Sequence, residues 1–308
     1  NAKGDKMTVI QEIREQLLSE YDRFAYAFAQ MDESDQHRYR KIKEELMSDH
    51  AQMSYYFIAS LSFLMARLEK YHDRKVMVFI DEYDTPFIEA HVNGFYDEVR
   101  SGLSSLLHNA LKASTSLQYA MLTGIQRVAK ENIFSDLNNL VVCTVKDREY
   151  AQYFGFTEEE TKTMLEYYGL ELNEEVKAMY NGYRFGDEEI YNPWSVLNYA
   201  SRRALEPYWV NTSSNKMIRK AMEGRDLTFA RGYEKLIETG RLETLVRMET
   251  SFFEVSSTDS LWGLFVNAGY LTIERVISHL DGLYVLRIPD QEVQREFQEL
   301  TACYLNVE

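Results

Sequence analysis

Two adjacent carboxylates, Asp81 and Glu82, follow directly on a short, unbroken apolar run, Val76–Ile80. Such a run is typical of a strand buried on both faces, and ligands of open α/β sheets bind beyond the carboxyl ends of the strands. One carboxylate at that edge can hold magnesium, and its neighbour can orient and polarise an attacking water. We therefore predict Asp81 as a metal ligand and Glu82 as a catalytic base. The alternative is that these acids only cap the helix that follows.

A second apolar run, Leu117–Leu122, ends in Thr123 and Gly124, and Arg127 follows three residues later. If the two runs are neighbouring parallel strands, a hydroxyl and a guanidinium reach the same sheet edge as the two acids. A polar residue there can sense a γ-phosphate, and an arginine can stabilise charge on a transferring phosphoryl group. The alternative is an N-cap threonine, a glycine turn and a surface arginine.

Three short apolar runs in the first half of the chain are predicted to be strands of one parallel sheet. They span residues 76–80, 117–122 and 140–145. Segments with helical character lie between them, and this alternation is typical of an α/β fold. Before the first run, apolar residues at helical spacing predict amphipathic helices over residues 8–30, 34–48 and 53–71.

The pattern becomes mainly helical in the second half of the chain. Thr157 and Glu160 have the spacing of a capping box, which marks a helix start. Tyr183–Phe185 and Ile190–Tyr191 are predicted to pair as a hairpin, and Pro193 then stands where a helix can begin.

The C-terminal part is predicted to form a helix that ends at Gly269, followed by two strands over residues 272–277 and 283–288. A helix followed by a hairpin indicates a winged-helix-like segment. We therefore expect three parts, an α/β domain, a helical lid and a winged-helix-like segment with the start of a linker, over residues 1–152, 153–240 and 241–308.

The charge of the chain argues against two classes of partner. The formal net charge is -15 and the isoelectric point is near 5.0, whereas nonspecific contact with nucleic acid or an anionic membrane needs an electropositive surface. No apolar run approaches the roughly 18 residues of a membrane span, and no signal peptide is evident. Cys143 and Cys303 are far apart in sequence and predict neither a disulfide framework nor a zinc site. A cytoplasmic protein without direct nucleic-acid binding is the expectation.

Several motifs along the chain resemble, in order, signatures of the bacterial AAA-ATPase-like family. They are Phe79–Pro86, Leu122–Val128, Ile133–Leu140, Tyr153–Glu160, Tyr180–Gly186, Tyr191–Ser195 and Ala268–Thr272. The resemblance implies a P-loop NTPase-like parallel sheet, incomplete at the N-terminus, followed by the lid and the winged-helix-like segment. It also implies ATP and Mg²⁺ as cofactors and a nuclease-like domain of the PD-(D/E)XK type as a partner in the same polypeptide.

The same resemblance implies a role for each candidate site residue. Asp81 and Glu82 correspond to the Walker B pair, with Asp81 on the metal. Thr123 and Arg127 correspond to sensor positions. Pro193, at a helix start in the lid, corresponds by analogy to a position that covers the nucleotide base.

The chain departs from the family at the phosphate-binding loop. The pattern G-x-x-x-x-G-K-[ST] does not occur, and Gly4–Thr8 has the wrong order of residues for it. Compared with the family, Asn1 falls after the second strand, so we expect a fragment of a longer protein that is inactive as it stands. Nothing after Ile288 supplies the carboxylates and lysine of a nuclease.

Two functions of different classes remain open from the sequence. The first is a magnesium-dependent ATP-binding switch or hydrolase that acts on an associated nuclease-like domain. The second is a noncatalytic protein-interaction scaffold that retains an ATPase-like fold. Substitutions of Asp81 or Glu82 would separate them, because only the first function needs these carboxylates.

Overall fold

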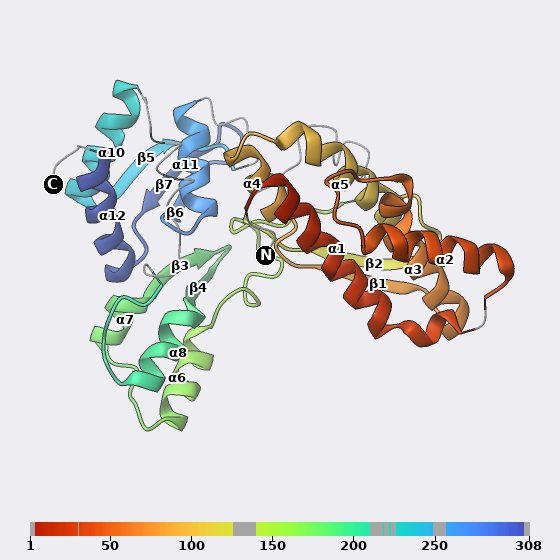
Figure 1. Cartoon of the computed structure of the whole chain (residues 1–308). Helices are drawn as coiled ribbons and strands as arrows, with labels where there is room; N and C mark the ends of the chain where they lie inside the picture. The colour runs from red at the N-terminus through yellow and green to blue at the C-terminus, as the bar shows by residue number, and fades with distance from the viewer. Residues whose placement is uncertain are drawn as a thin grey trace. The chain divides into compact units, whose positions relative to one another are not determined.

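The computed structural model describes residues 4–29, 31–125, 140–209, 218, 222, 226–248 and 257–304. For residues 301–304 it describes the backbone only. The described residues up to Leu140 form one compact unit, and those from Val141 onward form a second (Figure 1). Each unit has its own core, and each is described separately below. No helix in the described ranges has both the length and the apolar character needed to cross a membrane.

The first unit packs five α-helices and a short 3-10 helix with two strands. In chain order the elements are α1 (Lys6–Arg23), η1 (Ala25–Phe28), α2 (Glu33–Leu46), α3 (Tyr55–His72), β1 (Val76–Ile80), α4 (Thr85–Val92), α5 (Tyr96–Leu111) and β2 (Leu117–Leu122). Asp5 caps the N-terminus of α1, and Ser54 caps that of α3. The predicted α/β class and the first two predicted strands are confirmed.

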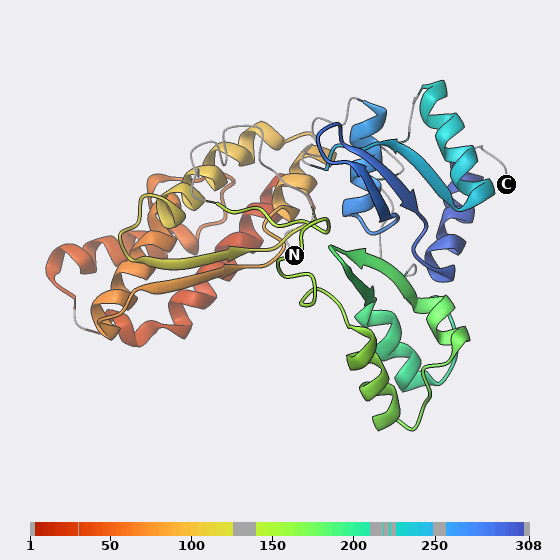
Figure 2. The same cartoon turned by 180° about the vertical axis from the view of Figure 1, so that it is seen from behind.

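The strands β1 and β2 pair in parallel, with Val76 opposite Leu117 and Ile80 opposite Leu122. Their carboxyl ends therefore meet at one edge of the sheet. One face of β1 packs into the core through Val78, whereas Met77 and Phe79 are exposed on the other face. Seen from behind, both strands lie in front of the helices of this unit (Figure 2).

The third predicted strand, residues 140–145, is wrong. Residues 140–144 belong to no helix or strand, and Val141 is 83% exposed. Within the described ranges the parallel sheet has two strands. Within the second unit, the carbonyl of Val145 instead accepts the Gly186 N–H at 2.8 Å, in the turn of the β3–β4 hairpin. A short apolar run has no period that separates a buried strand from a linker.

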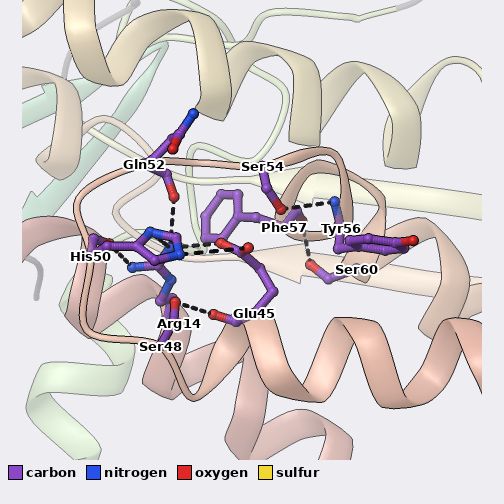
Figure 3. Close-up of polar contacts among 9 residues, drawn as sticks. All are labelled: Arg14, Glu45, Ser48, His50, Gln52, Ser54, Tyr56, Phe57 and Ser60. Atoms are coloured by element: carbon purple, nitrogen blue, oxygen red, sulfur yellow. Dashed lines mark hydrogen bonds and ion pairs between the residues drawn. The ribbon is translucent and has the colours of Figure 1, made fainter.

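A buried arginine joins three elements of the first unit (Figure 3). Arg14 of α1 is fully buried and donates to the Glu45 carboxylate of α2 at 2.7 Å. It also donates to the backbone carbonyls of His50 and Gln52, the latter at 2.7 Å, and to Nδ1 of His50 at 3.3 Å. The guanidinium lies 5.8 Å from the centre of the Phe57 ring. These contacts fix the loop between α2 and α3 against α1.

The second unit combines helices with a hairpin and a three-stranded antiparallel sheet. Its elements are α6 (Glu158–Tyr167), α7 (Glu174–Tyr180), β3 (Asn181–Phe185), β4 (Glu188–Tyr191), α8 (Pro193–Arg202), α10 (Leu227–Thr239), β5 (Arg241–Leu245), α11 (Thr258–Asn267), β6 (Thr272–Ser278), β7 (Leu283–Arg287) and α12 (Gln291–Tyr304). The strand order of the sheet is β5-β7-β6.

Local signals in this half predicted several elements correctly. The Thr157–Glu160 capping box is present, and β3 and β4 form the predicted hairpin. Its turn needs Gly186, whose φ of +55° favours glycine. The β6–β7 hairpin is also confirmed, but β5, which completes the sheet, was not predicted.

Two buried acids lie where β7 leads into α12. Asp290 accepts the Val293 N–H at 2.9 Å through Oδ1, while Oδ2 has no partner among the described residues. Glu292 accepts the Ser195 hydroxyl at 2.7 Å and the Trp209 N–H at 2.6 Å. Burial raises the pKa of Asp290 well above its usual range, and burial also raises the pKa of Glu292 despite these hydrogen bonds. Folding therefore favours the neutral forms.

The raised pKa values predict that the second unit loses stability as pH rises. The neutral acids contribute fully below the unfolded pKa near 4, and the contribution is lost as pH rises through the higher folded pKa. Asp290→Asn imitates the neutral form, so we expect it to weaken the pH dependence between pH 5 and 8 by at least about 1 kcal/mol. Urea denaturation at several pH values measures this effect. The exposed Glu299→Gln on α12 is the control, and an unchanged slope in Asp290→Asn would contradict the prediction.

Candidate functional site

The carboxyl ends of β1 and β2 bring three predicted site residues together. The Thr123 hydroxyl donates a hydrogen bond to Oδ1 of Asp81, and Glu82 is the next residue along the chain. The backbone also joins the two strand ends, because the Thr123 N–H donates to the Ile80 carbonyl at 2.9 Å. The Tyr83 N–H donates to the Thr123 carbonyl at 3.0 Å. The parallel register thus places the hydroxyl directly on the first carboxylate.

Glu82 has a backbone conformation that is uncommon for its residue type. Its φ is +51°, in the left-handed region, and its N–H donates to Oδ1 of Asp81 at 3.0 Å. A non-glycine residue there costs roughly 1–2 kcal/mol, and such strain gathers at functional sites. The Glu82 carbonyl accepts the Thr85 N–H at 3.1 Å, so the chain turns sharply into α4.

The alternative role of these acids, as helix caps, does not match the observed start of α4. The N-cap residue is Asp84, and α4 begins at Thr85 with Pro86 in its first turn. Within the described part of the chain, the side chains of Asp81 and Glu82 make no bond to the first turn of α4. Both side chains are exposed and face solvent at the sheet edge.

A groove in the first unit leads to this edge. Its volume is about 750 Å³, and it runs along β1 between side chains of α1, α3 and α5. The lining is apolar along most of its length, with Leu17, Met65 and Leu106 among its residues. Asp81 and Glu82 form a polar end of the groove. The two carboxylates are therefore reachable from a cavity of ligand size.

The residues at this edge fit magnesium only in part. Oδ1 of Asp81 accepts hydrogen bonds from the Thr123 hydroxyl and the Glu82 N–H, and the side chain is exposed. Magnesium commonly binds through one or two carboxylates together with waters and phosphates. The described residues contain no group of three or more His, Cys, Asp or Glu side chains placed to hold a metal. A magnesium ion at Asp81 would therefore depend on further ligands such as phosphate.

The residues do not fit a phosphate cradle. Gly4–Thr8 contains the start of α1, where Asp5 accepts the Thr8 N–H at 2.8 Å. The order of residues in this turn is not that of a G-x-x-x-x-G-K-[ST] loop, and the pattern occurs nowhere in the 308 residues.

The two remaining predicted site residues are Arg127 and Pro193. Arg127 lies outside the described residues. Pro193 is the first residue of α8 in the second unit, where the Asn192 side chain accepts the Trp194 N–H at 3.0 Å. Its predicted place at a helix start is confirmed, and its contact with a nucleotide stays a prediction.

Two residues to which the sequence analysis gave no part in the site lie at the same edge. Asp84 is buried, with 2% of its surface exposed, and Gly124 packs directly against it. The signal was present in the run Asp81–Pro86, which carries a third acid after the pair. The pattern did not reveal that this acid turns inward.

Comparison with known proteins gives one family and one curated relative. Residues 5–134 match the family model AAA-ATPase_like, described as "Predicted AAA-ATPase". A protein of Azotobacter chroococcum mcd 1, described as "Uncharacterized protein in vnfD 5'region", is 32% identical over 229 residues. The match covers 73% of this chain and 42% of the relative, so the chain spans less than half of that protein's length. No solved structure matches the chain.

Proposed function

We propose that this chain, whose residues 5–134 belong to the AAA-ATPase-like family, supplies the metal-binding and water-activating edge of a magnesium-dependent ATP-binding module. The observation that supports this most is the contact between the Thr123 hydroxyl and Asp81 beside the exposed Glu82. An acid pair and a hydroxyl at the carboxyl ends of neighbouring parallel strands are the groups that phosphoryl transfer needs at this edge.

Each residue has a separate part in this proposal. Asp81 would hold magnesium through its carboxylate, whose Oδ1 accepts hydrogen bonds from the Thr123 hydroxyl and the Glu82 N–H. When bound, magnesium would neutralise the negative charge of the phosphate groups. Glu82 orients a water and accepts its proton on a carboxylate oxygen. Thr123 and Arg127 read the γ-phosphate.

The lack of a phosphate-binding loop in these residues limits what the chain does alone. Backbone N–H groups and a lysine normally hold the β- and γ-phosphates, and the sequence provides no such loop. We therefore propose that the module is inactive without phosphate contacts from other residues. We further propose that in the whole protein it acts as a nucleotide-dependent switch for a nuclease-like domain.

Calorimetry of Mg-ATP binding tests the proposal on this 308-residue chain and on the natural full-length protein. We expect binding by the full-length protein alone, and Asp81→Asn should weaken it roughly 10- to 100-fold, because a hydrogen-bonded charge contributes about 1.5–3 kcal/mol. Glu15→Gln, an exposed carboxylate change on α1, is the control.

The other outcomes decide between the two functions left open by the sequence. Binding by neither protein would contradict the ATP-binding proposal and favour the noncatalytic interaction scaffold. Binding by the short chain would show that phosphates are held without the loop. Binding that Asp81→Asn leaves unchanged would remove Asp81 from the site.

A further inference from the structure

A buried carboxylate, Asp84, lies beneath the exposed acid pair and has no part in the proposed function. Only 2% of its surface is exposed, although Asp81 and Glu82 are exposed close by in the chain. Asp84 is the N-cap residue of α4, yet its side chain makes no capping hydrogen bond. Its side chain therefore does not act as the helix cap that its position would allow.

Gly124, at the end of β2, packs flat against this carboxylate. A Cβ atom on Gly124 would stand 2.5 Å from Oδ1 and 2.8 Å from Cγ of Asp84. The same atom would stand 2.9 Å from Cε1 of Tyr83. These distances are shorter than real Cβ contacts, so the backbone after β2 lies on Asp84 with no room for a side chain. Glycine is needed here because of this close approach.

A short series of contacts leads from Asp84 to the candidate metal ligand. Asp84 touches Gly124, and the adjacent Thr123 donates its hydroxyl to Asp81. The Tyr83 N–H, beside Asp84, holds the Thr123 carbonyl at 3.0 Å. The end of β2 is thus held from two sides, by a backbone bond and by the buried carboxylate.

We infer that Asp84 is a positioning residue, which acts through Gly124 to keep the Thr123 hydroxyl on Asp81. The consequence for magnesium and nucleotide rests on the proposed function, but the structural effect does not. A residue that only fills the core would stabilise the unit as a whole. A positioning residue instead controls the strand ends, here through the close contact of its carboxyl group with Gly124.

Amide hydrogen exchange in this 308-residue chain tests the structural effect. We expect Asp84→Ala to speed exchange of the Thr123 and Tyr83 amides about tenfold or more, while core amides of α3 and α5 change little. Asp84→Asn has the same shape and should retain most of the protection. Gly124→Ala should lose it, because the added methyl group displaces Asp84.

Two outcomes of the exchange experiment would overturn the inference. One is unchanged exchange at Thr123 and Tyr83 in both Asp84→Ala and Gly124→Ala. The other is an equal rise at every core amide of the first unit, which indicates packing alone. If Asp84→Ala does not fold, Gly124→Ala and Asp84→Asn still decide the result.

Magnesium titration of nucleotide binding in the natural full-length protein tests the functional consequence. Asp84→Ala should raise the half-saturating magnesium concentration about tenfold, and Asp84→Asn should restore it to near the wild-type value. An unchanged concentration in Asp84→Ala would overturn the link to the metal. If the wild type binds no nucleotide, the proposed function fails, while the exchange result still decides whether Asp84 positions Thr123.

Discussion

Arg14→Met is expected to lower the free energy of unfolding of the first unit by about 3–5 kcal/mol. The substitution removes the guanidinium that Glu45 faces at 2.7 Å and leaves that carboxylate buried without its countercharge. It also leaves the carbonyls of His50 and Gln52 without their donor. An unpaired buried charge costs more than the pair contributes, so the loss is large. Urea denaturation followed by circular dichroism measures it.

Two further variants distinguish the loss of the buried ion pair from the effect of removing any arginine. Arg40→Met removes an exposed arginine from α2, and we expect a change within about 0.5 kcal/mol. The double variant Arg14→Met/Glu45→Met removes both charges, so it should recover part of the lost stability. A loss below about 1 kcal/mol in Arg14→Met, or a double variant less stable than the single one, would contradict the account of the network.

The burial of Arg14 could not be predicted from the spacing of apolar residues. The spacing of Ile13 and Leu17 with other apolar residues predicted a helix over residues 8–30, and α1 (Lys6–Arg23) covers most of that range, with η1 (Ala25–Phe28) after it. Periodicity assigns a charged residue to the solvent face. Arg14 is buried instead, because the Glu45 carboxylate and two backbone carbonyls accept hydrogen bonds from its guanidinium. Those partners lie more than 30 residues away in the sequence, so no local pattern contains them.

The sequence predicted the part of the candidate site that follows from strand order, namely that two strand ends meet at one sheet edge. An apolar run ending in Asp81 and another ending in Thr123 predicted two parallel strands whose ends meet, and the register confirms this. The third run over residues 140–145 had the same apolar character but pairs with no strand among the described residues. Its Val145 carbonyl instead accepts the Gly186 N–H within the second unit, a tertiary contact that no local pattern contains.

Burial and backbone conformation at the candidate site could not be predicted from the sequence. The chain places three acids in a short segment, and the sequence does not show which of them are buried. Burial separates them, with Asp84 inward against Gly124 and the other two exposed. The left-handed backbone of Glu82 lies between these groups and is equally invisible in the pattern, because nothing local favours φ above zero for glutamate.

Glu82→Gln is expected to lower ATP turnover by the full-length protein about 10²- to 10⁴-fold while Mg-ATP binding stays near the wild-type value. Glutamine keeps the size and the hydrogen-bonding reach of the side chain but does not accept a proton from water, and general-base catalysis contributes a factor of this order. Steady-state turnover together with calorimetry separates the two effects. Loss of binding equal to the loss of turnover would contradict the role as a base.

The backbone strain at Glu82 allows a second, independent test through the free energy of unfolding. If the left-handed backbone is kept for function, Glu82→Gly relieves the strain and should leave the free energy of unfolding unchanged or slightly higher. The same change at Glu89, inside α4, should cost about 1 kcal/mol. Glu82→Gly should nevertheless lose turnover as Glu82→Gln does. Equal destabilisation at both positions would show that the backbone at Glu82 stores no strain, and the carboxylate would then owe its place to chain geometry alone.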